Sequence, residues 1–192
     1  MATFDRGFKS WAERTSANIR SELGLAPQDS LDVFRLAEFL DVTVLTPNDI
    51  PGLPVEVLDQ LSQKDPFGWH AVSLSLPDGQ MLLIYNPKKS AGRKASDIAH
   101  ELAHIVLEHK PSTVILSQDG SFAMRTYDQK QEDEANWLAW SLLLPREALI
   151  RAMRRSLSIE DTASLYGVSP QLVTYRLGVT GVSVQLARMR RR

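Results

Sequence analysis

Helical and strand-like patterns of apolar residues alternate along the first part of the chain. Apolar residues recur at three- and four-residue steps over residues 5–23 and 29–40, which predicts two amphipathic helices. We expect Ser30 to cap the second helix, because a serine hydroxyl can accept a hydrogen bond from a free backbone N–H. The β-branched stretch VTVLT, residues 42–46, predicts a short strand. Three prolines and a glycine predict a loop over residues 47–54.

Two strand-like stretches in the middle of the chain predict a β-hairpin. WHAVSLSL (69–76) and QMLLIYN (80–86) flank a Pro-Asp-Gly sequence, whose residues favour a tight turn. Apolar and polar residues alternate in the first stretch, which indicates that one face of the hairpin is covered. The helical pattern returns over residues 90–109 and again over 129–144, with a less regular sequence between them.

The C-terminal part of the chain carries a second set of helical patterns. Pro145 ends the preceding helix and suits the first turn of a further one, because its ring fixes a helical φ. Residues 159–177 resemble a helix-turn-helix in which Gly167 supplies the positive φ of the turn. Helices, then a small sheet, then further helices predict an α+β fold. We divide the chain into residues 1–144 and a basic helical segment, residues 145–192.

The composition is that of a soluble globular protein. Of the 192 residues, 43% are hydrophobic and 23% are charged, which is ordinary for a chain with a buried core. The apolar runs are far shorter than the roughly 18–20 residues that a membrane span needs, and the N-terminus shows no signal-peptide pattern. Because there are no cysteines, a metal site must use histidine and carboxylate ligands. We therefore expect a cytoplasmic protein without disulfides.

The charge is distributed unevenly along the chain. The net charge is -1, yet residues 151–192 hold eight arginines and only two acidic residues. A basic end on an otherwise acidic chain favours an acidic partner such as nucleic acid. A solvated, arginine-rich tail is the alternative interpretation.

Three of the four histidines lie within IAHELAHIVLEH, residues 98–109. On a helix, His100 and His104 lie one turn apart on the same face, a spacing that suits two nitrogen ligands of zinc. Glu101 lies about 100° around the helix, so its carboxylate can reach a water on the metal and act as general base. This H-E-x-x-H pattern predicts a metallohydrolase site. A surface helix with incidental histidines is the alternative, and we interpret His109, at the helix end, as structural.

A catalytic zinc ion takes a third protein ligand and keeps one position open. The acidic start of the predicted helix 129–144 offers Glu132, Asp133 and Glu134. Glu132 and Glu134 point about 200° apart on a helix, so only one of them can face the metal. Glu132 shares a face with Asn136, and this spacing is typical of glutamate zincins. An acidic helix N-terminus that is stabilised by the helix dipole is the alternative role for the remaining acids.

These motifs together resemble one known family. NPKKSAGRKASDIAHELAHIVLEH, residues 86–109, and EDEANWLAWSLLLP, residues 132–145, are similar to the ImmA/IrrE family of zinc metallo-endopeptidases. The resemblance extends roughly over residues 5–150. One departure is Leu138, which stands where the family usually has phenylalanine, and this bears on packing only.

The resemblance implies a fold, a cofactor and a set of roles. It implies a zincin-like metallopeptidase domain that binds Zn2+ through His100, His104 and Glu132. Glu101 would be the general base, and Asn136 would hydrogen-bond a ligand histidine. Family members are bacterial or phage-borne regulators that often act on a helix-turn-helix repressor. The resemblance therefore implies cleavage of a regulatory protein, most directly a transcriptional repressor, in the cytoplasm.

A second hypothesis rests on the helix-turn-helix-like segment 159–177. It makes the chain a DNA- or protein-binding transcriptional regulator, or a toxin–antitoxin component, in which the zinc site is structural or vestigial. A structural zinc site would normally be closed by a fourth ligand and needs no glutamate between its histidines, which favours the peptidase. Four residues of the second helix of this segment can contact bases or phosphates. They are Gln171, Thr174, Tyr175 and Arg176.

Overall fold

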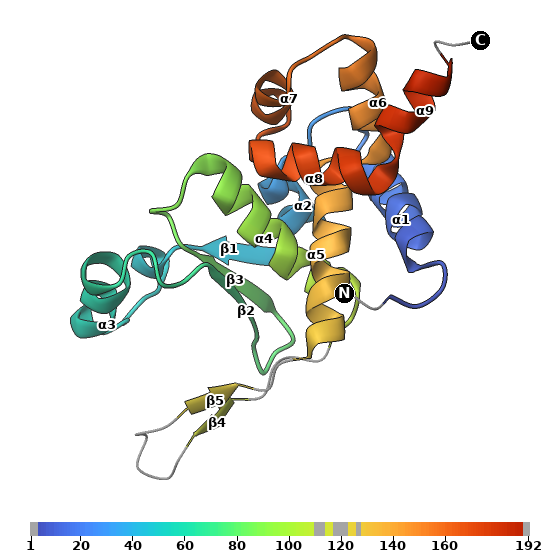
Figure 1. Ribbon diagram of the computed structural model, residues 1–192. Coiled ribbons are helices and arrows are strands. Elements are labelled where there is room, and N and C mark those ends of the chain that lie inside the picture. Colours follow the sequence, from blue (N-terminus) through green and yellow to red (C-terminus); the bar gives the residue numbers. More distant parts are fainter. Residues whose placement is uncertain (1–3, 110–113, 117–122, 126–127, 190–192) are drawn as a thin grey trace.

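A small sheet and a group of helices form the α+β fold that the sequence predicts (Figure 1). The computed structural model describes residues 4–109, 114–116, 123–125 and 128–189. The helices are α1 (Phe8–Glu22), α2 (Val33–Phe39), α3 (Val55–Asp59), α4 (Ala91–Val106), α5 (Gln129–Leu143), α6 (Arg146–Arg154), α7 (Ile159–Tyr166), α8 (Pro170–Thr180) and α9 (Val182–Met189). The strands are β1 (Val42–Leu45), β2 (Ala71–Ser75), β3 (Met81–Tyr85), β4 (Val114–Leu116) and β5 (Ala123–Arg125). Two short elements complete the order, a 3-10 turn over Pro47–Asp49 and a π-helical turn over Gln60–Lys64.

The three-stranded sheet has the order β1-β3-β2. β2 and β3 form the predicted hairpin, with Ser73 opposite Leu83, and Gly79 provides the positive φ of its turn. β1 pairs parallel to β3, so the chain crosses over between them through α3 and β2. β2 therefore lies at one edge of this sheet, and α4 packs against β2 and β3.

Helices α4 and α5 lie side by side at the centre of the molecule (Figure 1). Both helices bury alanines and leucines, with almost no exposed surface, in one core. These are Ala99, Leu102, Ala103, Ala135, Leu138, Ala139 and Leu142. Small side chains at such a contact let two helices approach closely. The polar residues beside this contact are therefore held at short distances from one another.

Most predicted helix boundaries agree with the structure to within a few residues. The cap of α2 is an exception, because Asp32 rather than Ser30 accepts the hydrogen bond from the Phe34 N–H, at 2.8 Å. Helix α7 begins at the predicted cap, where the Ser158 hydroxyl accepts from Asp161 N–H at 2.9 Å. Helices α3 and α9 are not among the predicted elements, and α3 is only five residues long.

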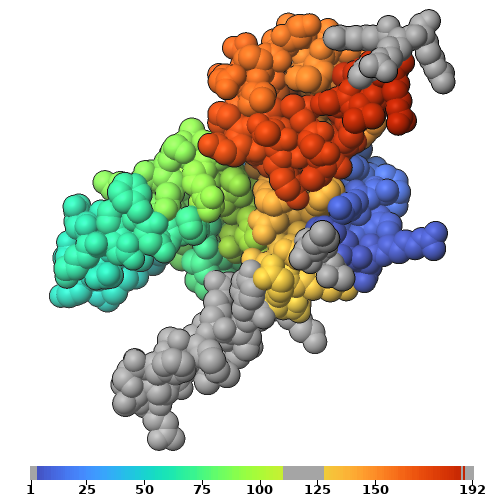
Figure 2. Space-filling model, in the orientation of Figure 1, coloured from blue at the N-terminus to red at the C-terminus, as the bar shows by residue number. Residues whose placement is uncertain are grey.

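The C-terminal helices pack directly on the rest of the chain (Figure 2). The Tyr166 hydroxyl donates to the Gln28 carbonyl at 2.9 Å, and Val173 is fully buried in the same core as α4 and α5. A Cβ on Gly92 would lie 3.3 Å from the carbonyl carbon of Val168, so the start of α4 contacts the turn between α7 and α8. Residues 1–144 and 145–192 thus share one core, and their division into two units stays a prediction.

Candidate metal centre

Helix α4 presents the two histidines of the motif as the spacing predicts. Ser90 precedes its first turn, and its apolar side, including Ile98 and Leu102, is fully buried. His100 and His104 lie on the polar side, with 22% and 18% of their side chains exposed. Partial exposure leaves their ring nitrogens accessible to a ligand from solvent.

Helix α5 brings one carboxylate to this pair of imidazoles. Glu132 lies in its first turn, where Asp128 caps the helix by accepting from the Lys130 N–H. Glu132 Oε2 lies 3.2 Å from His100 Nε2, and Glu132 Oε1 lies 3.6 Å from His104 Nε2. The two Nε2 atoms are 3.1 Å apart. Within the described part of the chain, these three side chains form a cluster suited to a metal ion.

The three spacings fit a tetrahedral zinc site. Zinc–nitrogen and zinc–oxygen bonds of about 2.0–2.1 Å at tetrahedral angles place neighbouring ligand atoms about 3.3–3.4 Å apart. The observed separations of 3.1, 3.2 and 3.6 Å lie on both sides of that value. Two nitrogens and one carboxylate oxygen are also the donor types that zinc takes in catalytic sites. The residues therefore fit the ion that the sequence predicts.

The Glu101 carboxylate lies between α4 and the edge strand β2. Its Oε2 atom accepts two hydrogen bonds from Ser73, one from the backbone N–H at 3.0 Å and one from the hydroxyl at 2.6 Å. Ser73 on strand β2 thus orients this oxygen.

Glu134 points away from the cluster, as the helical angle predicts. Its Oε2 lies 3.4 Å from His109 Nε2, and its Oε1 lies 3.8 Å from Lys130 Nζ. The structure therefore brings Glu132, and not Glu134, to the motif histidines. The roles of His100, His104, Glu101 and Glu132 nevertheless stay predictions until a metal is measured.

His109 has a closer relation to the site than the sequence indicated. Its Nδ1 lies 2.9 Å from His104 Nδ1, and only 8% of its side chain is exposed. Burial lowers the pKa of His109, against a smaller raising effect of the Glu134 carboxylate. Within the described residues, no hydrogen bond joins Asn136 to either ligand histidine, so the predicted role of Asn136 is not seen there.

Three of the predicted nucleic-acid contacts lie on the surface of α8, and the fourth does not. Gln171, Thr174 and Tyr175 are exposed, although the Tyr175 ring also packs edge-on against Trp140. Arg176 is fully buried, which corrects its assignment as a contact to DNA. Its guanidinium donates to the Leu144 carbonyl at 3.0 Å and forms an ion pair with Glu13. A side chain with no exposed surface cannot reach a phosphate outside.

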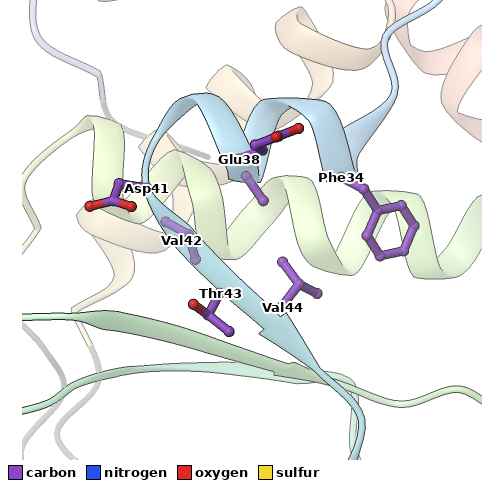
Figure 3. A pocket seen from close by; sticks show the side chains of 7 residues that line it. Phe34, Glu38, Asp41, Val42, Thr43 and Val44 are labelled. Atoms are coloured by element: carbon purple, nitrogen blue, oxygen red, sulfur yellow. The ribbon is translucent and has the colours of Figure 1, made fainter.

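A separate pocket of about 270 Å³ lies between α2 and β1 (Figure 3). Phe34, Glu38 and Val44 contribute to its lining, and no member of the metal-binding cluster does. The rest of its lining is Ala37, Asp41, Val42 and Thr43. Among the described residues, no helix is both long enough and apolar enough to cross a membrane.

The similarities to known proteins agree with this geometry. The model of peptidase family M78, an IrrE N-terminal-like domain, matches residues 56–178. No curated protein matches the chain. A solved structure of a Mycobacterium tuberculosis transcriptional regulator is similar at 19% identity and a TM-score of 0.51. The similarity covers 91% of this chain and 47% of that one, so the chain spans about half of that protein and shares its fold.

Proposed function

The chain belongs to peptidase family M78, the family of the IrrE N-terminal-like domain, and we propose that it is a zinc-dependent endopeptidase. The observation that carries the proposal is the convergence of His100, His104 and Glu132, with Glu101 held beside them by Ser73. A structural zinc site would be closed by a fourth protein ligand. The cluster of three described ligands favours a site that keeps a position for a substrate.

Each residue of the centre has a distinct part in the proposed hydrolysis. His100, His104 and Glu132 would hold the zinc ion through two nitrogens and one oxygen. Zinc in such a site would polarise a carbonyl group and would lower the pKa of a water molecule to near 7. Glu101 takes the proton of the attacking water at a carboxylate oxygen and returns it to the leaving amine. The two hydrogen bonds from Ser73 keep that carboxylate in one orientation between these transfers.

The edge strand β2 supports binding of an extended peptide. Among the described residues, β2 pairs with β3 on one side only, and its Ser73 N–H points to Glu101 on the other. An extended peptide can add to an exposed strand edge through main-chain hydrogen bonds. A peptide that lies along β2 would pass the Glu101 carboxylate, which brings a peptide bond to the proposed base.

We further propose that the substrate is a regulatory protein, a helix-turn-helix repressor, in a bacterial cytoplasm. Support comes from the resemblance to ImmA/IrrE peptidases, whose members often act on such repressors. The similar solved structure is named a transcriptional regulator, which is compatible with a role in transcription. The repressor itself is best sought among the products of neighbouring genes.

The proposal is tested by separating metal binding from cleavage. The Glu101→Gln protein should bind one zinc ion as wild type does and lose cleavage of the neighbouring repressor, measured by gel electrophoresis. His100→Ala and Glu132→Ala should lose the zinc ion in elemental analysis, whereas Glu134→Ala should keep it at saturating metal. Glu160→Gln, on the surface of α7, is the matched control and should cleave normally. Full activity of Glu101→Gln would exclude this mechanism.

The second candidate is a DNA-binding regulator with a structural zinc ion. The exposed Gln171, Thr174 and Tyr175 on α8 favour it, whereas the burial of Arg176 counts against it. It requires sequence-dependent DNA binding that weakens steeply with salt and persists in Glu101→Gln. No binding to DNA at low salt would remove this candidate.

A further inference from the structure

A row of three side chains leads from the candidate metal centre to Glu134 on helix α5. His104 Nδ1 faces His109 Nδ1 at 2.9 Å, and His109 Nε2 faces Glu134 Oε2 at 3.4 Å. The exposed fractions of these side chains are 18%, 8% and 13%. The row is therefore screened from solvent beyond the ligand histidine.

The partners in this row assign the protons on both imidazoles. A carboxylate accepts hydrogen bonds, so the His109 nitrogen that faces Glu134 carries the N–H. In a neutral imidazole, His109 Nδ1 is then an acceptor, and the proton between the two Nδ1 atoms belongs to His104. A proton on His104 Nδ1 leaves the lone pair of its Nε2 directed at His100 and Glu132, the other members of the cluster.

The end of helix α4 explains how His109 reaches this place. Glu108 adopts a left-handed conformation with φ 52°, and the His109 N–H bonds back to the His104 carbonyl at 3.0 Å. The Glu108 N–H bonds to the Ile105 carbonyl at 3.0 Å, which completes a Schellman motif. This turn folds the chain back, so residue 109 lies beside residue 104 rather than further along the helix axis.

We propose that His109, supported by Glu134, is a positioning residue that holds His104 in the orientation and proton state needed to bind the metal. The inference rests on the proposed zinc site and goes beyond the H-E-x-x-H motif and Glu132. A hydrogen-bond acceptor on the outer nitrogen of a ligand histidine fixes its ring and raises its basicity. Loss of such a partner typically weakens metal affinity about 10–100-fold.

Four variants of the full chain separate this role from simple packing. His109→Ala removes both contacts. His109→Asn places an amide oxygen near the position of Nδ1 and retains an acceptor for His104, whereas His109→Gln retains only a donor toward Glu134. His70→Ala is the matched control, because it removes another histidine next to a carboxylate, Asp97, on α4.

The readout is the zinc Kd, measured by competition with a chromophoric chelator. We expect His109→Ala and His109→Gln to bind zinc about 10–100-fold more weakly. His109→Asn should remain within a few-fold of wild type, and His70→Ala should be unchanged. The unfolding midpoint of each metal-free protein is measured as well. A merely structural role would lower those midpoints, and it would not make His109→Asn bind zinc more tightly than His109→Ala and His109→Gln.

Several results would overturn the inference. Wild-type affinity in His109→Ala would do so, as would equal losses in His109→Asn and His109→Ala. If the alanine variant does not fold, nitrogen-15 NMR of the zinc-loaded wild type decides, because the inference requires the proton on His104 Nδ1. Zinc binding that is absent in wild type, or that survives His104→Ala, would instead remove the proposed function together with this inference.

Discussion

Removal of the Glu13 carboxylate should destabilise the folded protein strongly, because it leaves a buried cation without a partner. Arg176 is fully buried, and its guanidinium pairs with Glu13 on α1, which is 26% exposed. Breaking a buried ion pair from one side costs about 3–5 kcal/mol. The partial exposure of Glu13 puts the effect toward the lower end of that range.

Glu13 also makes a second contact that the substitution removes. Its Oε2 accepts from the Arg146 backbone N–H at 3.1 Å, at the start of α6. A lost hydrogen bond of this kind contributes about 1 kcal/mol. We therefore expect Glu13→Ala to lower the free energy of unfolding by about 3–4 kcal/mol. At about 2–4 °C per kcal/mol, the Tm should fall by about 6–16 °C.

The measurement is urea unfolding followed by tryptophan fluorescence. Glu147→Ala is the matched control, because Glu147 forms an exposed pair with Arg146 at 3.9 Å and should contribute at most about 1 kcal/mol. The double variant Glu13→Ala/Arg176→Met should be more stable than Glu13→Ala alone, since it contains no unpaired charge. A decrease of less than about 1 kcal/mol in the free energy of unfolding of Glu13→Ala would refute the burial of this pair. So would a double variant whose decrease equals the sum of the decreases in the two single variants.

Three further predictions test other contacts. Ser73→Ala should lower kcat with little change in zinc content, because Glu101 keeps only the backbone hydrogen bond; an unchanged kcat would argue against the hydroxyl's role. Tyr166→Phe should be about 1 kcal/mol less stable at pH 7 through loss of its hydrogen bond to the Gln28 carbonyl. Burial raises the pKa of Tyr166, so wild-type stability falls above pH about 10 and the difference from Tyr166→Phe shrinks in alkaline urea titrations. Gly92→Val should cost about 1–3 kcal/mol, because its side chain meets the backbone at Val168; wild-type stability would contradict that contact.

The elements that repeat a local pattern could be read from the sequence. Helix α4 follows from its period of 3.6 residues, and the β2–β3 hairpin follows from alternation around a turn. The same periodicity puts His100 and His104 on one face and separates Glu132 from Glu134. These predictions depend on residues at most a few turns apart, where backbone geometry alone sets direction.

Two predictions about the role of a single residue could not be made correctly from local pattern. Arg176 looks like an exposed residue of a recognition helix, yet its guanidinium pairs with Glu13, 163 positions away. His109 looks like the charged end of a helix, yet a Schellman turn with glutamate in place of the usual glycine returns it to His104. Both roles depend on neighbours that no spacing rule connects.

The sequence by itself thus determines the types of donor atom in the candidate centre and their spacing along each helix. Both properties depend only on residues that are near one another in the chain. The packing of α4 on α5 specifies which carboxylate reaches the histidines and how close it lies, at 3.2 and 3.6 Å. The folded structure also decides which polar groups are buried, because burial depends on every segment packed around a side chain. That is why the grouping of His100, His104 and Glu132 was predictable from the sequence, whereas the partners of His104 and Arg176 required the fold.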